Sequence, residues 1–140
     1  KLCSMSFVDS ADDVLDLKKL HTNVNVVAKI ETEKGVNNLD EILDVTDGLL
    51  IDRGDLSRQV PIEKVPFFQR RIISICKSYN KPIYVATNLL ESMVFSKSPN
   101  RAEVNDVVST ILMGADGLVL AAETAIGVNP VQSVKIIRCL

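Results

Sequence analysis

The chain has 140 residues, of which 46% are hydrophobic and 24% are charged, as in an ordinary globular domain with an apolar core. The net charge of −2 at pH 7 and an aromatic content of 4% disfavour a nucleic-acid-binding surface, which needs basic patches and stacking rings. The 3 cysteines form neither a disulfide framework nor a zinc-ligand spacing, and no apolar run reaches the ~18 residues of a membrane span. We therefore expect a cytoplasmic protein with reduced thiols and without nucleic-acid or membrane partners.

Apolar runs of strand length alternate along the chain with stretches of helical periodicity. The expected strands cover residues 2–8, 24–30, 49–51, 83–86 and 118–120. The expected helices cover residues 10–20, 36–45, 62–80, 89–93, 102–113 and 130–140, with irregular loops at 55–61 and 96–100. No low-complexity linker or domain boundary interrupts this alternation, which predicts an α/β fold of parallel (β/α) units.

Two architectures fit this alternation. A closed (β/α)8 barrel typically needs ~250 residues, so the chain is too short for a whole barrel. It is either an open α/β unit or the second half of a TIM barrel. The start at Lys1 and the end within the expected helix 130–140 favour the half-barrel.

Polar residues follow several of the expected strands at the point where each strand ends. Lys29 and Glu31 end strand 24–30, Asp55 follows Gly54 after strand 49–51, and Thr87 follows strand 83–86. The carboxyl ends of parallel strands meet at one face, where α/β proteins place their chemistry. We therefore expect these side chains to lie together.

The residue types at this face suit a small anion and a divalent cation. Glu31 and Asp55 can bind Mg²⁺, which prefers carboxylate oxygens, and Lys29 can offset charge on a phosphate or enolate. The Thr87 hydroxyl can donate to a substrate carboxylate. Each residue also has a simpler interpretation: a Lys29–Glu31 ion pair at a strand end, Asp55 as a turn or cap residue, and Thr87 bonded to the backbone. Spacing alone leaves these alternatives open.

Longer motifs favour a ligand site over these simpler interpretations. The most specific segments are Ala28-Lys29-Ile30-Glu31, Arg53-Gly54-Asp55-Leu56, Ala86-Thr87-Asn88-Leu89-Leu90-Glu91-Ser92-Met93, Pro99-Asn100-Arg101-Ala102-Glu103 and Glu123-Thr124-Ala125. In this order they resemble the pyruvate kinase family, and the similarity runs over nearly all of the chain. The resemblance implies that residues 1–140 form part of the family's catalytic barrel domain, strands four to eight. The first strands, the lid domain and the C-terminal regulatory domain lie outside this sequence.

The resemblance also implies a reaction and a role for each site residue. The family transfers a phosphoryl group from phosphoenolpyruvate to ADP in glycolysis, giving pyruvate and ATP. Glu31 and Asp55 would then bind Mg²⁺ or Mn²⁺, and Lys29 would stabilise the transferred group. The backbone at Gly54 and Asp55, with the Thr87 hydroxyl, would hold the carboxylate of phosphoenolpyruvate or pyruvate. The family's K⁺ ligands and most nucleotide contacts lie outside this sequence, the full-length protein would be a homo-oligomer, a tetramer in the family, and the 140 residues alone would be inactive.

Several positions depart from the family's usual residues. Asp52 stands where the family usually has Ala, Ser57 where it has Gly, Asn88 where it has Gln, and Ala121-Ala122 where it has Ser-Gly. Asp52 adds a carboxylate beside an anion site. These departures keep a second function open, in which the same site serves a lyase acting on pyruvate-like enolates or a non-catalytic binding module. Arg53 is expected to pair with Asp52, with the aspartate of its own turn, or with an acid across an interface.

Overall fold

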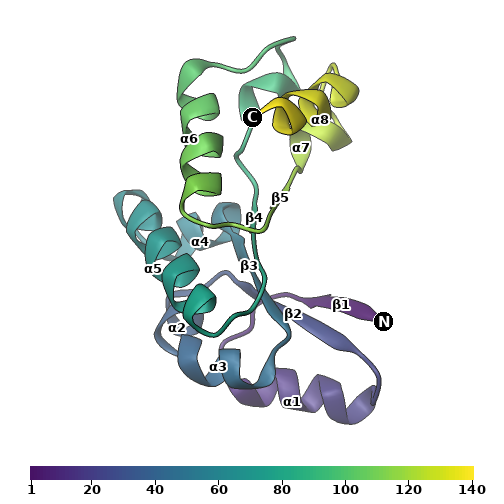
Figure 1. Ribbon diagram of the computed structural model, residues 1–140, viewed down its shortest axis with the longest axis vertical. Helices are drawn as coiled ribbons and strands as arrows, with labels where there is room; N and C mark the ends of the chain where they lie inside the picture. The colour runs from purple at the N-terminus through teal and green to yellow at the C-terminus, as the bar shows by residue number, and fades with distance from the viewer.

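One parallel sheet of five strands organises the computed structural model, which describes residues 1–140 (Figure 1). The strands are β1 (Leu2–Met5), β2 (Asn25–Ile30), β3 (Gly48–Asp52), β4 (Ile83–Ala86) and β5 (Gly117–Val119). Each pairs in parallel with the next strand of the chain, in the order β1-β2-β3-β4-β5. A sequential parallel order is that of a (β/α)-barrel wall, whereas a doubly wound sheet reverses its order. The predicted fold class is confirmed.

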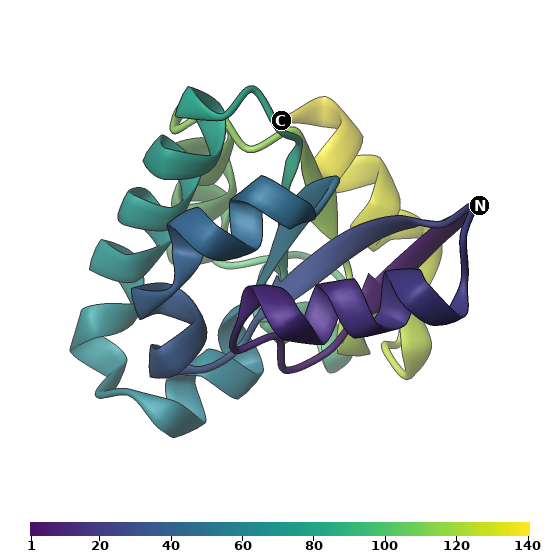
Figure 2. The same ribbon diagram turned by 90° about the horizontal axis from the view of Figure 1, so that it is seen from below.

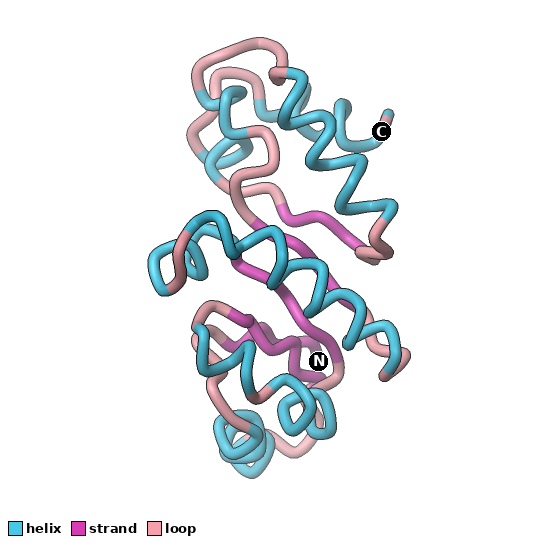
Figure 3. The backbone as a smooth tube through the Cα atoms, turned by 90° about the vertical axis from the view of Figure 1, so that its left-hand side faces the viewer, coloured by secondary structure: helices cyan, strands magenta, loops and turns pink.

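The helices are short and lie beside the strands of the sheet. They are α1 (Ala11–Leu20), α2 (Glu33–Asn37), α3 (Leu39–Val45), α4 (Arg53–Gln59), α5 (Val65–Ser78), α6 (Arg101–Leu112), α7 (Ala122–Ala125) and α8 (Pro130–Cys139), with 3-10 turns η1 (Ile62–Lys64) and η2 (Glu91–Val94). Figures 1 and 2 show α1 next to β2, and Figure 3 shows the strands bordered by the helices along the molecule. No helix is long and apolar enough to cross a lipid bilayer.

The sequence missed two helices and merged others. The expected loop at 55–61 was wrong, because α4 covers most of it; of the residues of α4 only Arg53 and Leu56 are buried, too few to produce a helical apolar period. The single helix expected at 36–45 is two helices, broken at Asn38, whose side chain donates to the Asp9 carbonyl. Helix α7 has only 4 residues, too few to show a helical period in the sequence.

The core lies between the sheet and the helices. Val26, Ala28 and Ile30 of β2 are fully buried and belong to one apolar cluster with residues of α3 and α5. Side chains alternate along a strand, so Lys29 and the residue that follows Ile30 face the other side of the sheet. The alternation of β2 therefore separates an apolar layer against the helices from a polar group at the strand end.

Candidate functional site

Lys29 and Glu31 form the centre of the polar group at the end of β2. The Nζ atom of Lys29 lies 2.6 Å from Oε1 of Glu31 and 3.2 Å from Oδ2 of Asp52. Burial acts to lower the pKa of Lys29, but hydrogen bonds and charges from both carboxylates outweigh it and raise that pKa above its ordinary value. Lys29 is therefore a fixed cation at neutral pH, held by carboxylates of two neighbouring strands.

Asp52 lies beside Glu31 because of the pairing register of the sheet. Ile30 pairs with Ile51, so extending the register by one residue places Asp52 opposite Glu31. Side chains opposite each other on parallel strands point to the same face. The sequence showed Asp52 at a strand end and as a departure but did not include it among the site residues, although strand alternation and register together could have placed it there.

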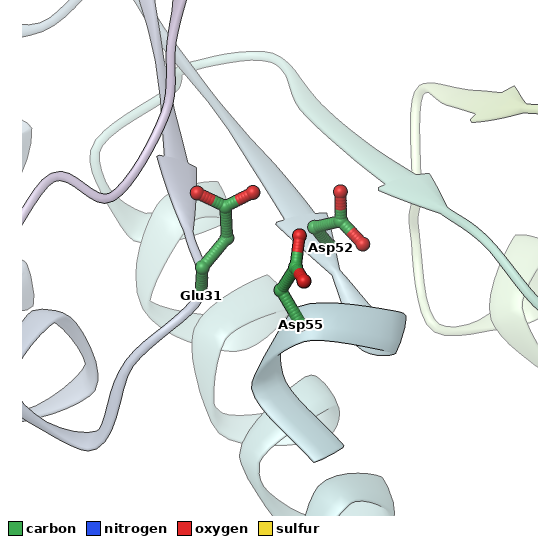
Figure 4. Close-up of side chains that lie close together, drawn as sticks. All are labelled: Glu31, Asp52 and Asp55. Atoms are coloured by element: carbon green, nitrogen blue, oxygen red, sulfur yellow. The ribbon is translucent and has the colours of Figure 1, made fainter. Parts of the chain in front are cut away.

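Asp55 joins these two carboxylates from the first turn of α4. A carboxylate is favoured there, because the helix N-terminus carries partial positive charge. One carboxylate oxygen from each of Glu31, Asp52 and Asp55 lies within 4.8 Å of the others, and Figure 4 shows the three side chains converging. Asp55 also pairs with the exposed Arg58 at 3.2 Å.

The donor set fits a hard divalent cation. Glu31 is fully buried, and its Oε1 atom has no hydrogen bond of good geometry, only the ion pair with Lys29. An ionised carboxylate offers about four lone-pair positions, so Glu31 can bind a cation besides the ammonium of Lys29. Clustered carboxylate oxygens are the ligands that Mg²⁺ and Mn²⁺ prefer. The residues predicted as metal ligands, Glu31 and Asp55, are thus brought together, with Asp52 as a third carboxylate.

Thr87 lies next to this cluster at the end of β4. Its Oγ1 accepts a hydrogen bond from the Gly54 N–H at 2.8 Å and lies 3.1 Å from Oδ1 of Asp52. The hydroxyl has one proton, which it donates either to Asp52 or to the Ala86 carbonyl at 2.6 Å. A Cβ at Gly54 would lie 3.3 Å from Oγ1, so glycine permits this close approach.

The segment that carries Thr87 has an unusual backbone. Thr87 and Asn88 both have positive φ angles, 67° and 53°, and such a conformation is strained for a β-branched residue. The buried guanidinium of Arg53 donates to both carbonyls of this pair, at 2.8 Å and 2.9 Å, and forms an ion pair with Asp106 at 2.6 Å. Arg53 therefore pairs with Asp106, not with Asp52 or another acid of its own turn. This partner lies 53 residues away, and no local signal could indicate it.

A cavity of about 280 Å³ opens beside these residues. Asp52, Gly54, Asp55 and Thr87 line it, whereas Lys29 and Glu31 are not among its lining residues. Residues of η2 and of the segment after β5, including Glu123, also line this cavity. The Glu123 carboxylate accepts backbone N–H groups of Leu90 and Ala121, and so holds this wall in place.

Together, the sequential parallel strands and the polar cluster at their carboxyl ends define a protein of the (β/α)-barrel class. A family model described as "Pyruvate kinase, barrel domain" matches residues 1–134. The chain therefore belongs to the pyruvate kinase family, and the predicted resemblance is confirmed.

Curated relatives agree with this assignment. The chain is 44% identical to a pyruvate kinase of Thermotoga maritima over 138 residues, which is 96% of this chain and 30% of that protein. It is 43% identical to a pyruvate kinase of Candida albicans over 95% of this chain and 27% of that protein. For a pyruvate kinase of Geobacillus stearothermophilus the identity is 44%, over 93% of this chain and 23% of that protein. The chain thus spans less than a third of the length of these relatives.

Proposed function

We propose that residues 1–140 are strands four to eight of the catalytic barrel of a cytoplasmic pyruvate kinase, which transfers a phosphoryl group from phosphoenolpyruvate to ADP. Convergence of Lys29, Glu31, Asp55 and Thr87 at one end of the sheet supports this proposal most strongly. Phosphoryl transfer depends on positioning and charge neutralisation, and these are the properties of a fixed cation beside clustered carboxylates.

Glu31 and Asp55 would hold Mg²⁺ or Mn²⁺ through one carboxylate oxygen each. The ion would neutralise charge on substrate oxygens when bound. Lys29 supplies a positive charge that the protein has already ordered, since two carboxylates fix its ammonium before any substrate arrives. Its role is to stabilise charge on the phosphoryl group during transfer.

The substrate carboxylate would bind at the start of α4. The backbone N–H groups of Gly54 and Asp55 lie in the first turn of this helix, where N–H groups have no intrahelical partner. The Gly54 N–H now donates to the Thr87 hydroxyl, so a bound carboxylate would exchange this contact for its own. Thr87 would then donate its proton to the carboxylate and orient the enol for protonation.

Other parts of the reaction need residues from outside the 140 described here. We propose that the ligands of K⁺, most contacts to ADP and ATP, and the surfaces that form a homo-oligomer, a tetramer in the family, belong to other parts of the full-length protein. By this proposal the 140 residues alone have no kinase activity.

A second candidate function follows from the contact between Asp52 and Lys29. The Asp52 carboxylate already pairs with the ammonium of Lys29, which a transferred phosphoryl group would need. A protein with the same metal and enolpyruvate site could therefore act as a lyase on pyruvate-like substrates or bind pyruvate without catalysis.

Steady-state kinetics of the full-length protein tests the kinase proposal. Wild type should make ATP from phosphoenolpyruvate and ADP with Mg²⁺ and K⁺. The variant Lys29→Met should lose about 10²-fold or more in turnover, far more than it loses in phosphoenolpyruvate affinity, because the cation acts mainly in the transition state. Absence of ATP synthesis in the wild type would favour the second candidate function. Near-normal turnover in the variant would show that Lys29 only forms an ion pair at the strand end.

Titration with Mn²⁺ tests the proposed metal ligands separately. Glu31→Gln and Asp55→Asn each remove one anionic ligand, so we expect both variants to bind Mn²⁺ more weakly than the wild type. Glu63→Gln, which changes an exposed glutamate of η1, is the matched control. Unchanged affinity in both site variants would contradict the assignment.

A further inference from the structure

Asp52 has contacts that the proposed reaction does not explain. Its side chain is only 11% exposed and lies at the last position of β3. One carboxylate oxygen lies 3.2 Å from the ammonium of Lys29, and the other lies 3.1 Å from the hydroxyl of Thr87. Asp52 therefore contacts both side-chain donors that the proposed function assigns to the substrate.

The geometry makes Asp52 an internal competitor for an anionic ligand. A substrate carboxylate needs the Thr87 hydroxyl, and a substrate phosphate needs Lys29. Alanine at this position would leave both groups free and would remove one negative charge. With Asp52 present, the carboxylates of Glu31 and Asp52 share the ammonium of Lys29.

We propose that Asp52 is a specificity-determining residue, which weakens the binding of phosphoenolpyruvate relative to that of pyruvate at this site; the inference rests on the proposed enolpyruvate site. Repulsion from a fixed carboxylate grows with the charge of the ligand. Phosphoenolpyruvate carries a carboxylate and a phosphate, and its phosphate would approach Lys29 against Asp52. Pyruvate carries only a carboxylate and leaves the Lys29–Asp52 pair intact.

Equilibrium binding to the full-length protein separates the two ligands. Affinities for phosphoenolpyruvate and for pyruvate are measured by calorimetry at an Mn²⁺ concentration that saturates each variant, as shown by prior titration. Asp52→Ala should bind phosphoenolpyruvate about tenfold more tightly than wild type, which corresponds to about 1.4 kcal/mol. Affinity for pyruvate should rise less, by up to about threefold, because its carboxylate gains only the Thr87 hydroxyl that Asp52 contacts in the wild type. Asp52→Asn, which keeps the size of the side chain, should shift the ratio in the same direction.

Glu91→Gln provides the matched control. Glu91 is an exposed carboxylate that lines the same cavity and bonds to Asn88, but it contacts neither Lys29 nor Thr87. Its neutralisation should leave the ratio of the two affinities within about threefold of wild type. An equal gain in this variant would show that any charge in the cavity acts alike, and would overturn the specific role of Asp52.

The remaining outcomes distinguish this inference from the proposed function. Phosphoenolpyruvate binding that Asp52→Ala leaves unchanged overturns the role of Asp52 alone, and the proposed function stands. Weaker Mn²⁺ and weaker binding of both ligands in that variant would make Asp52 a metal ligand and overturn the selectivity. If Asp52→Ala gains affinity for phosphoenolpyruvate and Asp52→Asn does not, the effect comes from the volume of the side chain, and the selectivity proposal is overturned. Failure of every variant to bind either ligand overturns both proposals.

Discussion

Replacing Arg53 by methionine should destabilise the barrel domain and displace Thr87. The guanidinium is buried and donates to the carbonyls of Thr87 and Asn88, to the Asp106 carboxylate and to the Gln69 side chain. Methionine keeps most of the apolar stem but none of these donors. The Thr87–Asn88 pair would then lose the bonds that hold its positive φ angles.

The size of the effect follows from these contacts. Two partly buried carbonyls without a donor cost about 1–2 kcal/mol each. The ion pair adds less than about 1 kcal/mol, because the side chain of Asp106 is 39% exposed and can be hydrated. The total is about 2–5 kcal/mol. At ~3 °C per kcal/mol, which is usual for domains of about 150–250 residues, the melting temperature should fall by about 6–15 °C.

Scanning calorimetry of the full-length protein measures this shift, and Arg70→Met is the control. Arg70 is exposed, and its only hydrogen bond is to the Pro66 carbonyl of its own helix, so its variant should melt within about 1 °C of wild type. Turnover should fall in Arg53→Met and remain unchanged in the control. Equal melting temperatures for both variants would refute the view that Arg53 supports the Thr87 segment.

Two further predictions concern titratable groups away from the site. Burial, assisted by the charge of Asp116, raises the pKa of Cys76 to about 11. A thiol reagent at pH 8 should therefore label this cysteine only after denaturation. Peptide mass spectrometry measures the labelling, and labelling of Cys76 in the native protein would contradict the prediction. The Ile83 N–H and then the Lys77 ammonium lower the pKa of Asp116 below its ordinary value of 3.8, so its stabilising effect is present above that pH and is lost as the pH falls through the lowered pKa. Asp116→Asn should therefore melt below wild type at pH 7, and the difference should shrink below about pH 4; a difference that is constant with pH would show that charge is not the cause.

The strands and part of the site could be predicted because they depend on local patterns. Each expected strand exists, since short apolar runs between turn residues are a strong signal in a parallel sheet. Strand alternation placed Lys29 and Glu31 on one face, where the structure has them in contact. The resemblance added the roles of the site residues, which remain predictions until they are tested.

The remaining features depend on contacts that are distant in the sequence. Helix α4 forms at the end of β3 with few apolar residues, so its sequence looks like a loop. The partner of Arg53 lies on α6, and only the folded sheet brings Asp106 near it. The contact of Asp52 with Thr87 needs the pairing of β3 with β4, because the two residues are 35 positions apart.

The alternation of β2 has a consequence for how the sheet finds its correct alignment. If β2 shifted by one residue against β3, every side chain of β2 would change faces. Lys29 and Glu31 would enter the apolar layer beneath the helices, and Ala28 and Ile30 would leave it. Burial of charges without matched partners costs several kcal/mol, so the shifted arrangement would be strongly disfavoured. Lys29 and Glu31, which we propose act in the reaction, thus also disfavour a wrong register of β2 against β3 before any ligand is present.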